Sequence, residues 1–343
     1  MSTEQTQSMP ASQSEPERKP RPGMLGRLGR SLLHSREASI VIAGILLVIY
    51  FQSTAPAFLS ASNIANLSAY TATTAIIAAG EVLVVICGEI DLSVGQVYAL
   101  APFVMVYAHE AGAPYLLAIV LGLAVGIVVG FINGFVTVML RIPSFITTLG
   151  TLFIINGFTL TISGGFPVQP HADPFTVNLF GGNPISQFFW AIGVTLVFQF
   201  ILVKTRWGLH TVATGGNLIG ASEVGIKIAR IKIGNFILCS VLGGLAGILD
   251  AFRISSVDPL AGGTDIMFMA VASSVIGGTL LTGGSGTIIG AFLGAAVLGI
   301  LKDGFTLSGV SAYTFDMILG AAILLTMLIN VHLSRLRAAG GAR

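Results

Sequence analysis

Charged residues are scarce in this chain. Asp, Glu, Lys and Arg make up 9% of its 343 residues, whereas about a quarter of an average soluble domain is charged. Hydrophobic residues make up 54%, and the mean hydropathy is +0.88. This balance excludes an ordinary soluble protein and predicts an all-α fold, a polytopic bundle of transmembrane helices.

Cysteine and histidine are also rare, and neither gathers into a site. Cys87 and Cys239 fall in apolar segments without a CxxC motif, and the five histidines are scattered over loops and ends. We therefore expect no disulfide framework and no metal site. The sequence contains no Walker phosphate loop and no Ser/His/Asp arrangement, so we expect no catalytic residues, no cofactor bound by this chain and no enzymatic activity.

Long apolar runs predict the membrane spans. With a window of about 20 residues, we expect about ten spans. Because several of the segments are short or rich in glycine, the expected number ranges from eight to ten. Together they form a transmembrane domain over residues 38–333. The expected spans are 38–58, 63–87, 93–108, 115–139, 144–163, 186–203, 234–254, 266–281, 286–301 and 313–333.

Basic residues predict the orientation. With the N-terminus inside, 15 of the 17 Lys and Arg residues fall on the cytoplasmic side, and the two exceptions are Arg253 and Lys302. The positive-inside rule therefore places both termini in the cytoplasm. Residues 1–37 are expected to form a disordered basic tail and residues 334–343 a second cytoplasmic tail. The net charge of +2 reflects this asymmetry and indicates no nucleic-acid partner.

One long polar segment interrupts the apolar chain at residues 204–233. It carries Arg206, Lys227, Arg230 and Lys232 against a single acid, Glu223, which predicts a cytoplasmic loop. A short helix is expected around residues 220–226, after a turn at residues 215–217. The segment suits either a docking element or a solvated loop that fixes topology.

Two further patterns point to the interior of the bundle. Gly122, Gly126, Gly130 and Gly134 repeat every fourth residue, which predicts a bare helix face for close packing. The sequence GEIDLSVG at residues 88–95 places two acids between apolar runs, with Asp91 or Ser93 positioned to cap a helix. An acid at membrane depth costs about 3 kcal/mol unless it is paired, hydrated or functional.

Four motifs in order resemble the permeases of ATP-driven importers for ribose, xylose and galactose. They are GEIDLSVG, the segment RIPSFITTLGT at residues 141–151, the polar loop, and the GGT…GGSGT stretch at residues 277–287. One departure is that Met267 and Met269 stand where that family commonly has acids. In the loop, the resemblance assigns contact with an ATPase subunit to Gly216, Asn217, Gly220, Ala221, Gly225 and Ile226.

The resemblance implies a permease subunit in the bacterial inner membrane that translocates a monosaccharide. It further implies a separate ATPase subunit that holds ATP and Mg, a solute-binding protein docked near residues 164–187, and a homodimer or a heterodimer with a similar permease. Polar or aromatic residues near central spans are candidates for the solute pathway, or they bond to neighbouring helices. These are Asp91, Ser93, Asn133, Phe145, Thr147, Thr148 and Asn156.

Two other functions remain open from the sequence. An ion-coupled secondary transporter could use Glu81, Glu89 or Asp91, although Glu81 and the pair formed by Asp250 and Arg253 are better suited to internal pairing. Within the resembling superfamily, a branched-chain amino acid or a nucleoside is the alternative cargo.

Overall fold

The computed structural model describes residues 36–311, 314, 317–318, 320–321 and 324. The tails predicted at 1–37 and 334–343 lie outside these residues, apart from Arg36 and Glu37, and so does most of the span predicted at 313–333. The described part of the chain is helical and has no named strand. A single antiparallel bridge joins Val168 to Val257.

Helices occupy nine of the ten expected spans within the described ranges, and seven of them are long and apolar enough to cross a membrane. The helices in the expected spans are α2 (Arg36–Thr54), α3 (Ala61–Ile86), α4 (Val94–Glu110), α5 (Tyr115–Met139), α6 (Ser144–Ser163), α8 (Pro184–Lys204), α11 (Ile228–Ile254), α12 (Gly263–Ile276) and α13 (Ile288–Leu307). Three shorter helices are α7 (Pro174–Leu179), α9 (Arg206–Gly216) and α10 (Leu218–Glu223).

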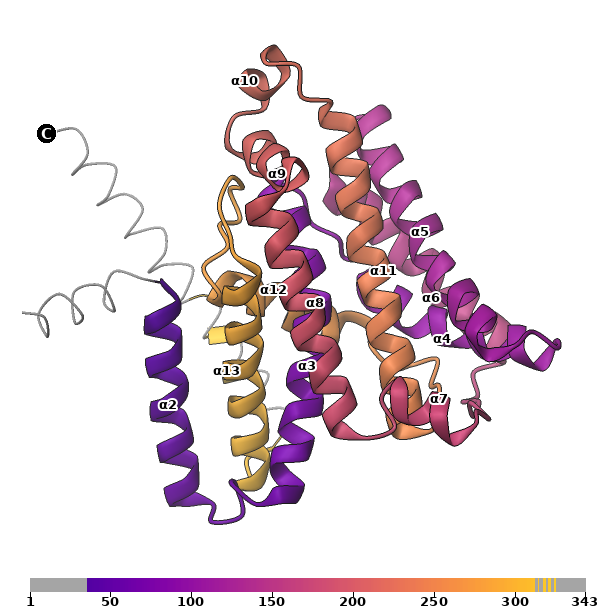
Figure 1. Cartoon of the computed structure of the whole chain (residues 1–343), viewed down its shortest axis with the longest axis vertical. Coiled ribbons are helices and arrows are strands. Elements are labelled where there is room, and N and C mark those ends of the chain that lie inside the picture. Colours follow the sequence, from indigo (N-terminus) through magenta and orange to yellow (C-terminus); the bar gives the residue numbers. More distant parts are fainter. Residues whose placement is uncertain (1–35, 312–313, 315–316, 319, 322–323, 325–343) are drawn as a thin grey trace, which may run out of the picture.

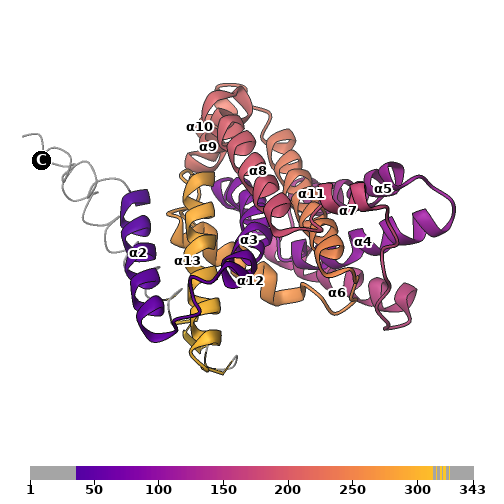
Figure 2. The ribbon, with the colours of Figure 1, turned by 60° about the horizontal axis from the view of Figure 1, so that its bottom comes forward.

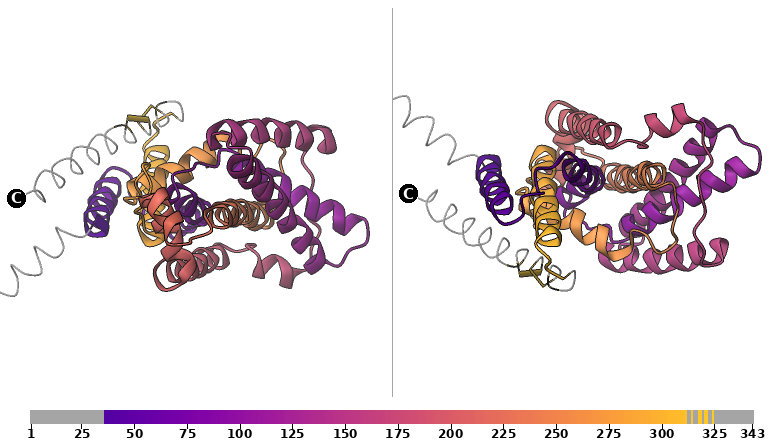
Figure 3. Two further views of the ribbon diagram at one scale, coloured as in Figure 1. Left: turned by 90° about the horizontal axis from the view of Figure 1, so that it is seen from above. Right: turned by 90° about the horizontal axis from the view of Figure 1, so that it is seen from below.

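Helix α3 forms the centre of the bundle. It packs against α8, α11, α12 and α13. The apolar stretch of α3 that is long enough to cross a membrane is almost wholly buried. Helix α2 stands at the edge beside α13, as the views along the bundle show (Figures 2 and 3). Helices α9 and α10 lie at one end of the bundle, and α7 lies at the opposite end (Figure 1).

Three predicted boundaries differ from the structure by five or six residues, and one of them is the end of helix α13, which lies at Leu307 rather than at residue 301. Helix α11 begins at Ile228 rather than at residue 234, because Lys232 and Asn235 find partners inside the protein and do not stop the helix. Helix α12 ends at Ile276 rather than at residue 281. There the chain turns through Gly278, whose φ of +91° strains any residue with a Cβ.

The glycines that repeat every fourth residue on α5, Gly122 to Gly134, form a face that we call the glycine stripe. Three of them pack against the backbone of α11, and the spacing predicted such close packing. A Cβ on Gly130 would lie 2.5 Å from the Cα of Ile237, and one on Gly134 would lie 2.7 Å from the Cα of Ile233. Gly126 approaches the backbone at Ser240 and Val241 equally closely. The two helix backbones therefore touch without side chains between them.

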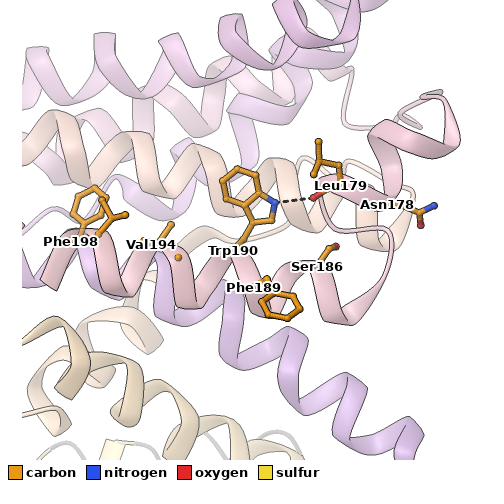
Figure 4. A pocket seen from close by; sticks show the side chains of 9 residues that line it. Asn178, Leu179, Ser186, Phe189, Trp190, Val194 and Phe198 are labelled. Atoms are coloured by element: carbon orange, nitrogen blue, oxygen red, sulfur yellow. Dashed lines mark hydrogen bonds between the residues drawn. The ribbon is translucent and has the colours of Figure 1, made fainter. Parts of the chain in front are cut away.

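Helix α7 is fixed to the side of α8. Asp173 caps its N-terminus by accepting hydrogen bonds from the backbone N–H groups of Phe175 and Thr176. The hydrogen bond from the Thr176 hydroxyl, followed by these backbone bonds, lowers the pKa of Asp173. The Trp190 indole N–H donates to the carbonyl oxygen of Leu179 at 2.9 Å, beside an apolar pocket of 570 Å³ (Figure 4). The loop at residues 164–187 is thus partly ordered by α8.

Replacing Gly130 by Ala tests the α5–α11 contact. The added Cβ would overlap the backbone of α11, and overpacking of this kind typically costs about 1–3 kcal/mol. We expect a lower unfolding temperature in detergent for Gly130→Ala. Gly150→Ala in α6 is the matched control, because a Cβ there meets nothing within 4 Å. Equal unfolding temperatures for the two variants would contradict the contact.

Candidate coupling site

The polar interruption folds into two consecutive short helices. The Thr205 hydroxyl accepts the backbone N–H of Gly208 at the start of α9, and the Asn217 side chain accepts the backbone N–H of Gly220 at 2.9 Å at the start of α10. Such oxygens satisfy the free N–H groups of a first helical turn. Asn217 therefore separates the two helices, and Gly216 is the last residue of α9 rather than part of a turn.

The predicted short helix is present but is displaced toward the N-terminus. It covers Leu218–Glu223 instead of residues 220–226. It ends where Gly225 adopts a φ of +84°, and the N–H groups of Gly225 and Ile226 donate to the carbonyls of Ser222 and Ala221. This pattern is a glycine C-cap, so Gly225 is needed for its conformation.

Helix α10 and its C-cap residue Val224 present apolar side chains that sequence reasoning missed. Ile219 and Val224 are 72% and 78% exposed, and Leu218 is also exposed. Ala221, one of the residues assigned to coupling, instead points inward and is buried. An exposed apolar cluster on a polar segment is typical of a protein–protein contact. The available signal was the run Leu218–Ile219 directly after the capping residue Asn217.

Backbone contacts join α9 to two other segments, and we call this three-way contact the glycine junction. Its members are Ile86 at the end of α3, Gly215 and Gly216 at the end of α9, and Gly283 and Gly284 in the loop between α12 and α13. The N–H of Gly284 donates to the carbonyl of Ile86 at 2.8 Å. A Cβ on Gly215 would lie 1.6 Å from that same carbonyl oxygen. The polar loop and the GGT…GGSGT stretch, two of the four motifs, thus meet at the end of α3.

Asn235 ties α9 to the membrane helices by its side chain. Its amide accepts the Trp207 indole N–H at 2.8 Å and donates toward the Thr211 hydroxyl and the carbonyl of Leu83. The Trp207 ring also covers Gly234, where a Cβ would lie 2.3 Å from it. Helix α9 is therefore attached to both α3 and α11.

Glu89 and Lys232 form an ion pair that was not predicted. The Lys232 Nζ lies 2.5 Å from the Glu89 Oε1, and both side chains are 14% exposed. It is one of two salt bridges in the described part of the chain. The pair connects the non-helical stretch between α3 and α4 with the start of α11. Its position beside the glycine junction places Glu89 near the end of the bundle that carries α9 and α10.

Asp91 lies deeper, inside a closed polar network. Its Oδ1 accepts the N–H and the hydroxyl of Ser93 at 2.9 and 2.7 Å, and its Oδ2 accepts the Ser240 hydroxyl at 3.2 Å. Ser240 follows Lys232 by eight residues on α11, roughly 12 Å along the axis. Asn133 donates to the Ser93 Oγ and accepts from Thr151. The network joins four segments of the bundle.

The predicted helix cap at this position is wrong. Ser93 occupies the N-cap position of α4 but makes no side-chain cap bond, and Asp91 forms a local turn with Ser93 instead. The break between α3 and α4 is further closed from α6. There the Ser144 hydroxyl accepts a hydrogen bond from the backbone N–H of Ile90, and the Thr148 hydroxyl donates one to the carbonyl of Ile90. These polar groups satisfy a backbone that has left its helix.

The structure separates the seven pathway candidates. Asp91, Ser93, Asn133 and Thr148 are fully buried, and their polar side-chain atoms bond to one another or to the backbone. Thr147 is also buried, Asn156 is half-buried, and Phe145 is exposed on the outside of α6. Asp91, Ser93 and Asn133 share one network, and Thr148 bonds to the backbone beside it. The buried Thr147 hydroxyl has no hydrogen-bond partner, and Phe145 is not part of the network.

Among the groups considered for pairing, Asp250 and Arg253 form the second salt bridge at 2.6 Å, as expected. Glu81 is buried and is contacted by a thiol instead of a basic group. The Cys239 Sγ lies 3.6 Å from its Oε1. No cluster of three or more potential metal ligands occurs within the described residues.

Comparison with known proteins identifies the family. Residues 63–327 match the family described as the permease component of the branched-chain amino acid transport system. The chain belongs to this permease family. Like its homologues it is therefore a transport permease subunit, and it is a multi-pass protein of the inner membrane.

Curated relatives resemble the chain over most of its length. The xylose/arabinose import permease XylH of Sulfolobus acidocaldarius is 34% identical over 87% of this chain and 86% of its own. The ribose import permease RbsC of Escherichia coli K12 is 35% identical over 86% of this chain and 93% of its own. The D-allose transport permease AlsC of the same strain is 31% identical over 89% and 94%.

The Glu89–Lys232 pair can be tested by a double-mutant cycle. Removing one partner leaves a largely buried charge, and hydrogen bonds to charged groups typically contribute about 1.5–3 kcal/mol. We expect Glu89→Gln and Lys232→Met each to lower the unfolding temperature of the purified permease. The double variant should lose less than the sum of the two single losses. Simple additivity would show that the pair contributes nothing.

Proposed function

We propose that the chain is the membrane-spanning subunit of an ATP-driven importer that translocates a monosaccharide delivered by a solute-binding protein. The support for the sugar is that the relatives named above import ribose, xylose or arabinose, and allose. The support for the mechanism is geometric. Helices α9 and α10 lie at one end of the bundle, α10 carries exposed apolar side chains, and backbone contacts join α9 to the membrane helices.

The glycine junction supports a mechanical role for α9 and α10. Contact between backbones leaves no flexible side chain to absorb a displacement. A force on α10 therefore acts on α3 and on the loop that leads into α13. Closure of an ATPase partner would push on residues 208–228 and tilt the helices of the glycine stripe, which would move the permease between outward-open and inward-open states.

The partners follow from this role. Because the sequence has no phosphate-binding loop, ATP and Mg would be held by a separate ATPase subunit that contacts α10. The solute-binding protein would dock at the opposite end, near α7. The permease would act as a dimer, either with a second copy or with a similar permease. A branched-chain amino acid, named in the family description, is the alternative cargo.

The proposed topology has ten spans with both termini in the cytoplasm. Helix α12 has 14 residues and rises roughly 21 Å, which is less than the hydrocarbon thickness of about 30 Å. The partly buried loop after it, from Gly277 to Thr287, would complete this crossing. Helix α4 is completed in the same way by the stretch at residues 87–93.

A charge on α10 tests the contact with the ATPase. Ile219→Asp and Val224→Asp would each place a carboxylate in the apolar cluster, and we expect the ATPase subunit to co-purify at least tenfold less. Phe166→Asp is the matched control, because Phe166 is 74% exposed at the opposite end. Retention of the ATPase by both α10 variants, at the level of the control, would contradict the docking role.

Labelling tests the orientation. In a chain whose Cys87 and Cys239 are replaced by Ser, we expect a membrane-impermeant maleimide to modify Lys227→Cys only from the cytoplasmic side and Asp258→Cys only from outside. Both side chains are exposed, so reactivity reports the side of the membrane. Modification of Lys227→Cys from outside intact cells would overturn the topology and the coupling role together.

A further inference from the structure

A polar cavity lies at the end of the bundle away from α9 and α10. It has a volume of about 270 Å³ and is enclosed by α3, α4, α11, α12 and α13. Arg253, on its wall, follows Ile228 by 25 residues on α11, which corresponds to roughly 37 Å along the helix. The cavity is therefore separate from the coupling site. It is also separate from the Asp91 network, because Asp250 follows Ser240 by ten residues on α11, roughly 15 Å along the axis.

Four charged residues line this cavity in a chain that has few charges. They are Asp250, Arg253, Asp265 and Lys302. Arg253 and Lys302 are also the two basic residues that the charge distribution leaves outside the cytoplasmic set. Ionisable residues that gather around a cavity of a helical membrane protein commonly mark a solute path. Their convergence on one cavity therefore indicates a binding site.

The charged groups differ in how much of their bonding capacity is already used. The Asp250 carboxylate receives the Arg253 guanidinium on one oxygen and the Tyr98 hydroxyl on the other. Asp265 is exposed, and Lys302 forms no salt bridge within the described part of the chain. Asp265 can accept and Lys302 can donate further hydrogen bonds. Arg253 retains N–H groups beyond those that face Asp250.

The net charge and the size of the cavity limit the ligand. Two acids and two bases cancel, so the cavity favours neither a free cation nor a free anion. Its volume is slightly below the range of roughly 300–1,000 Å³ that holds drug-sized ligands. The exposed Tyr70 ring, with the Lys302 ammonium 5.4 Å from its centre, adds an apolar surface beside polar groups. A small molecule with many hydroxyl groups satisfies donors, acceptors and this ring together.

We propose that this cavity binds a neutral polyhydroxylated solute of the size of one sugar ring, before the solute passes through the permease. The proposal rests on the proposed import of a monosaccharide and adds a site on this chain. Asp265 and Lys302 contact the hydroxyl groups, and the Asp250–Arg253–Tyr98 cluster forms a fixed polar wall. Met269 is part of the same lining.

Saturation-transfer NMR tests the site on the full-length permease in nanodiscs, with D-ribose, D-xylose, D-allose or L-leucine as the probe. We expect a signal from at least one of the sugars and none from leucine. The variant that combines Asp265→Asn with Lys302→Met leaves the net charge of the cavity unchanged, and it should lower the sugar signal at least fivefold. Lys302→Arg, which keeps the charge and the donors, should retain most of it. Glu110→Gln, an exposed acid outside the cavity, is the control.

A separate measurement distinguishes failure of the site from failure of the import function. Uptake of the same sugars is measured in vesicles that contain the permease with its ATPase and binding protein. If wild-type vesicles import a sugar but the combined variant gives the same NMR signal as Glu110→Gln, the cavity proposal is wrong and import stands. A signal from leucine alone would overturn the proposed ligand class. If the combined variant does not fold, Asp265→Asn alone replaces it, because that side chain is exposed.

Discussion

The organisation of this protein depends on how backbone groups are satisfied where helices stop inside the bundle. In a membrane, an N–H or carbonyl that leaves a helix has no water to bond with. Helix α3 stops at Ile86 and helix α12 stops at Ile276. The carbonyl of Ile86 is bonded by Gly284 from the loop after α12, and the N–H of Ile288 at the start of α13 is bonded by the Gln199 side chain. The two breaks therefore depend on each other.

This requirement also explains the polar residues around Asp91. Ser144 and Thr148 bond the backbone of Ile90, and Asp91, Ser93, Asn133, Thr151 and Ser240 bond among themselves. A buried polar group without a partner costs about 1–3 kcal/mol, so a complete network is favoured over a partial one. Four of the residues proposed for a solute path, Asp91, Ser93, Asn133 and Thr148, thus also hold a helix break closed. The cavity with free charged groups lies at the other end of the bundle.

The sequence predicted the parts that follow from local patterns. Apolar runs located nine helices, with ends up to six residues away from those in the structure. The four-residue glycine spacing predicted a helix face for close backbone packing, and the turn expected at residues 215–217 indicated a short helix after it in the polar segment. Contacts between distant residues were not predictable, because no pattern links Glu89 to Lys232 or Ile86 to Gly284. The cavity was missed for the same reason. Tyr70, Asp265 and Lys302 stand in three separate segments, and only the packing of α3, α12 and α13 brings them together.

The same helices connect the two ends of the bundle. Helix α3 ends at the glycine junction and contributes Tyr70 to the cavity, and α13 follows the junction loop and contributes Lys302. A helix behaves as a rod over this length, and packed interfaces shift between discrete arrangements rather than deform continuously. In the proposed importer, a displacement of α9 would therefore reach Tyr70 and Lys302 through the glycine junction, and it would reach Arg253 through the attachment of α9 to α11. Closure of the ATPase and release of the solute would be linked by this movement, because the groups that contact the solute sit on the helices that the junction drives.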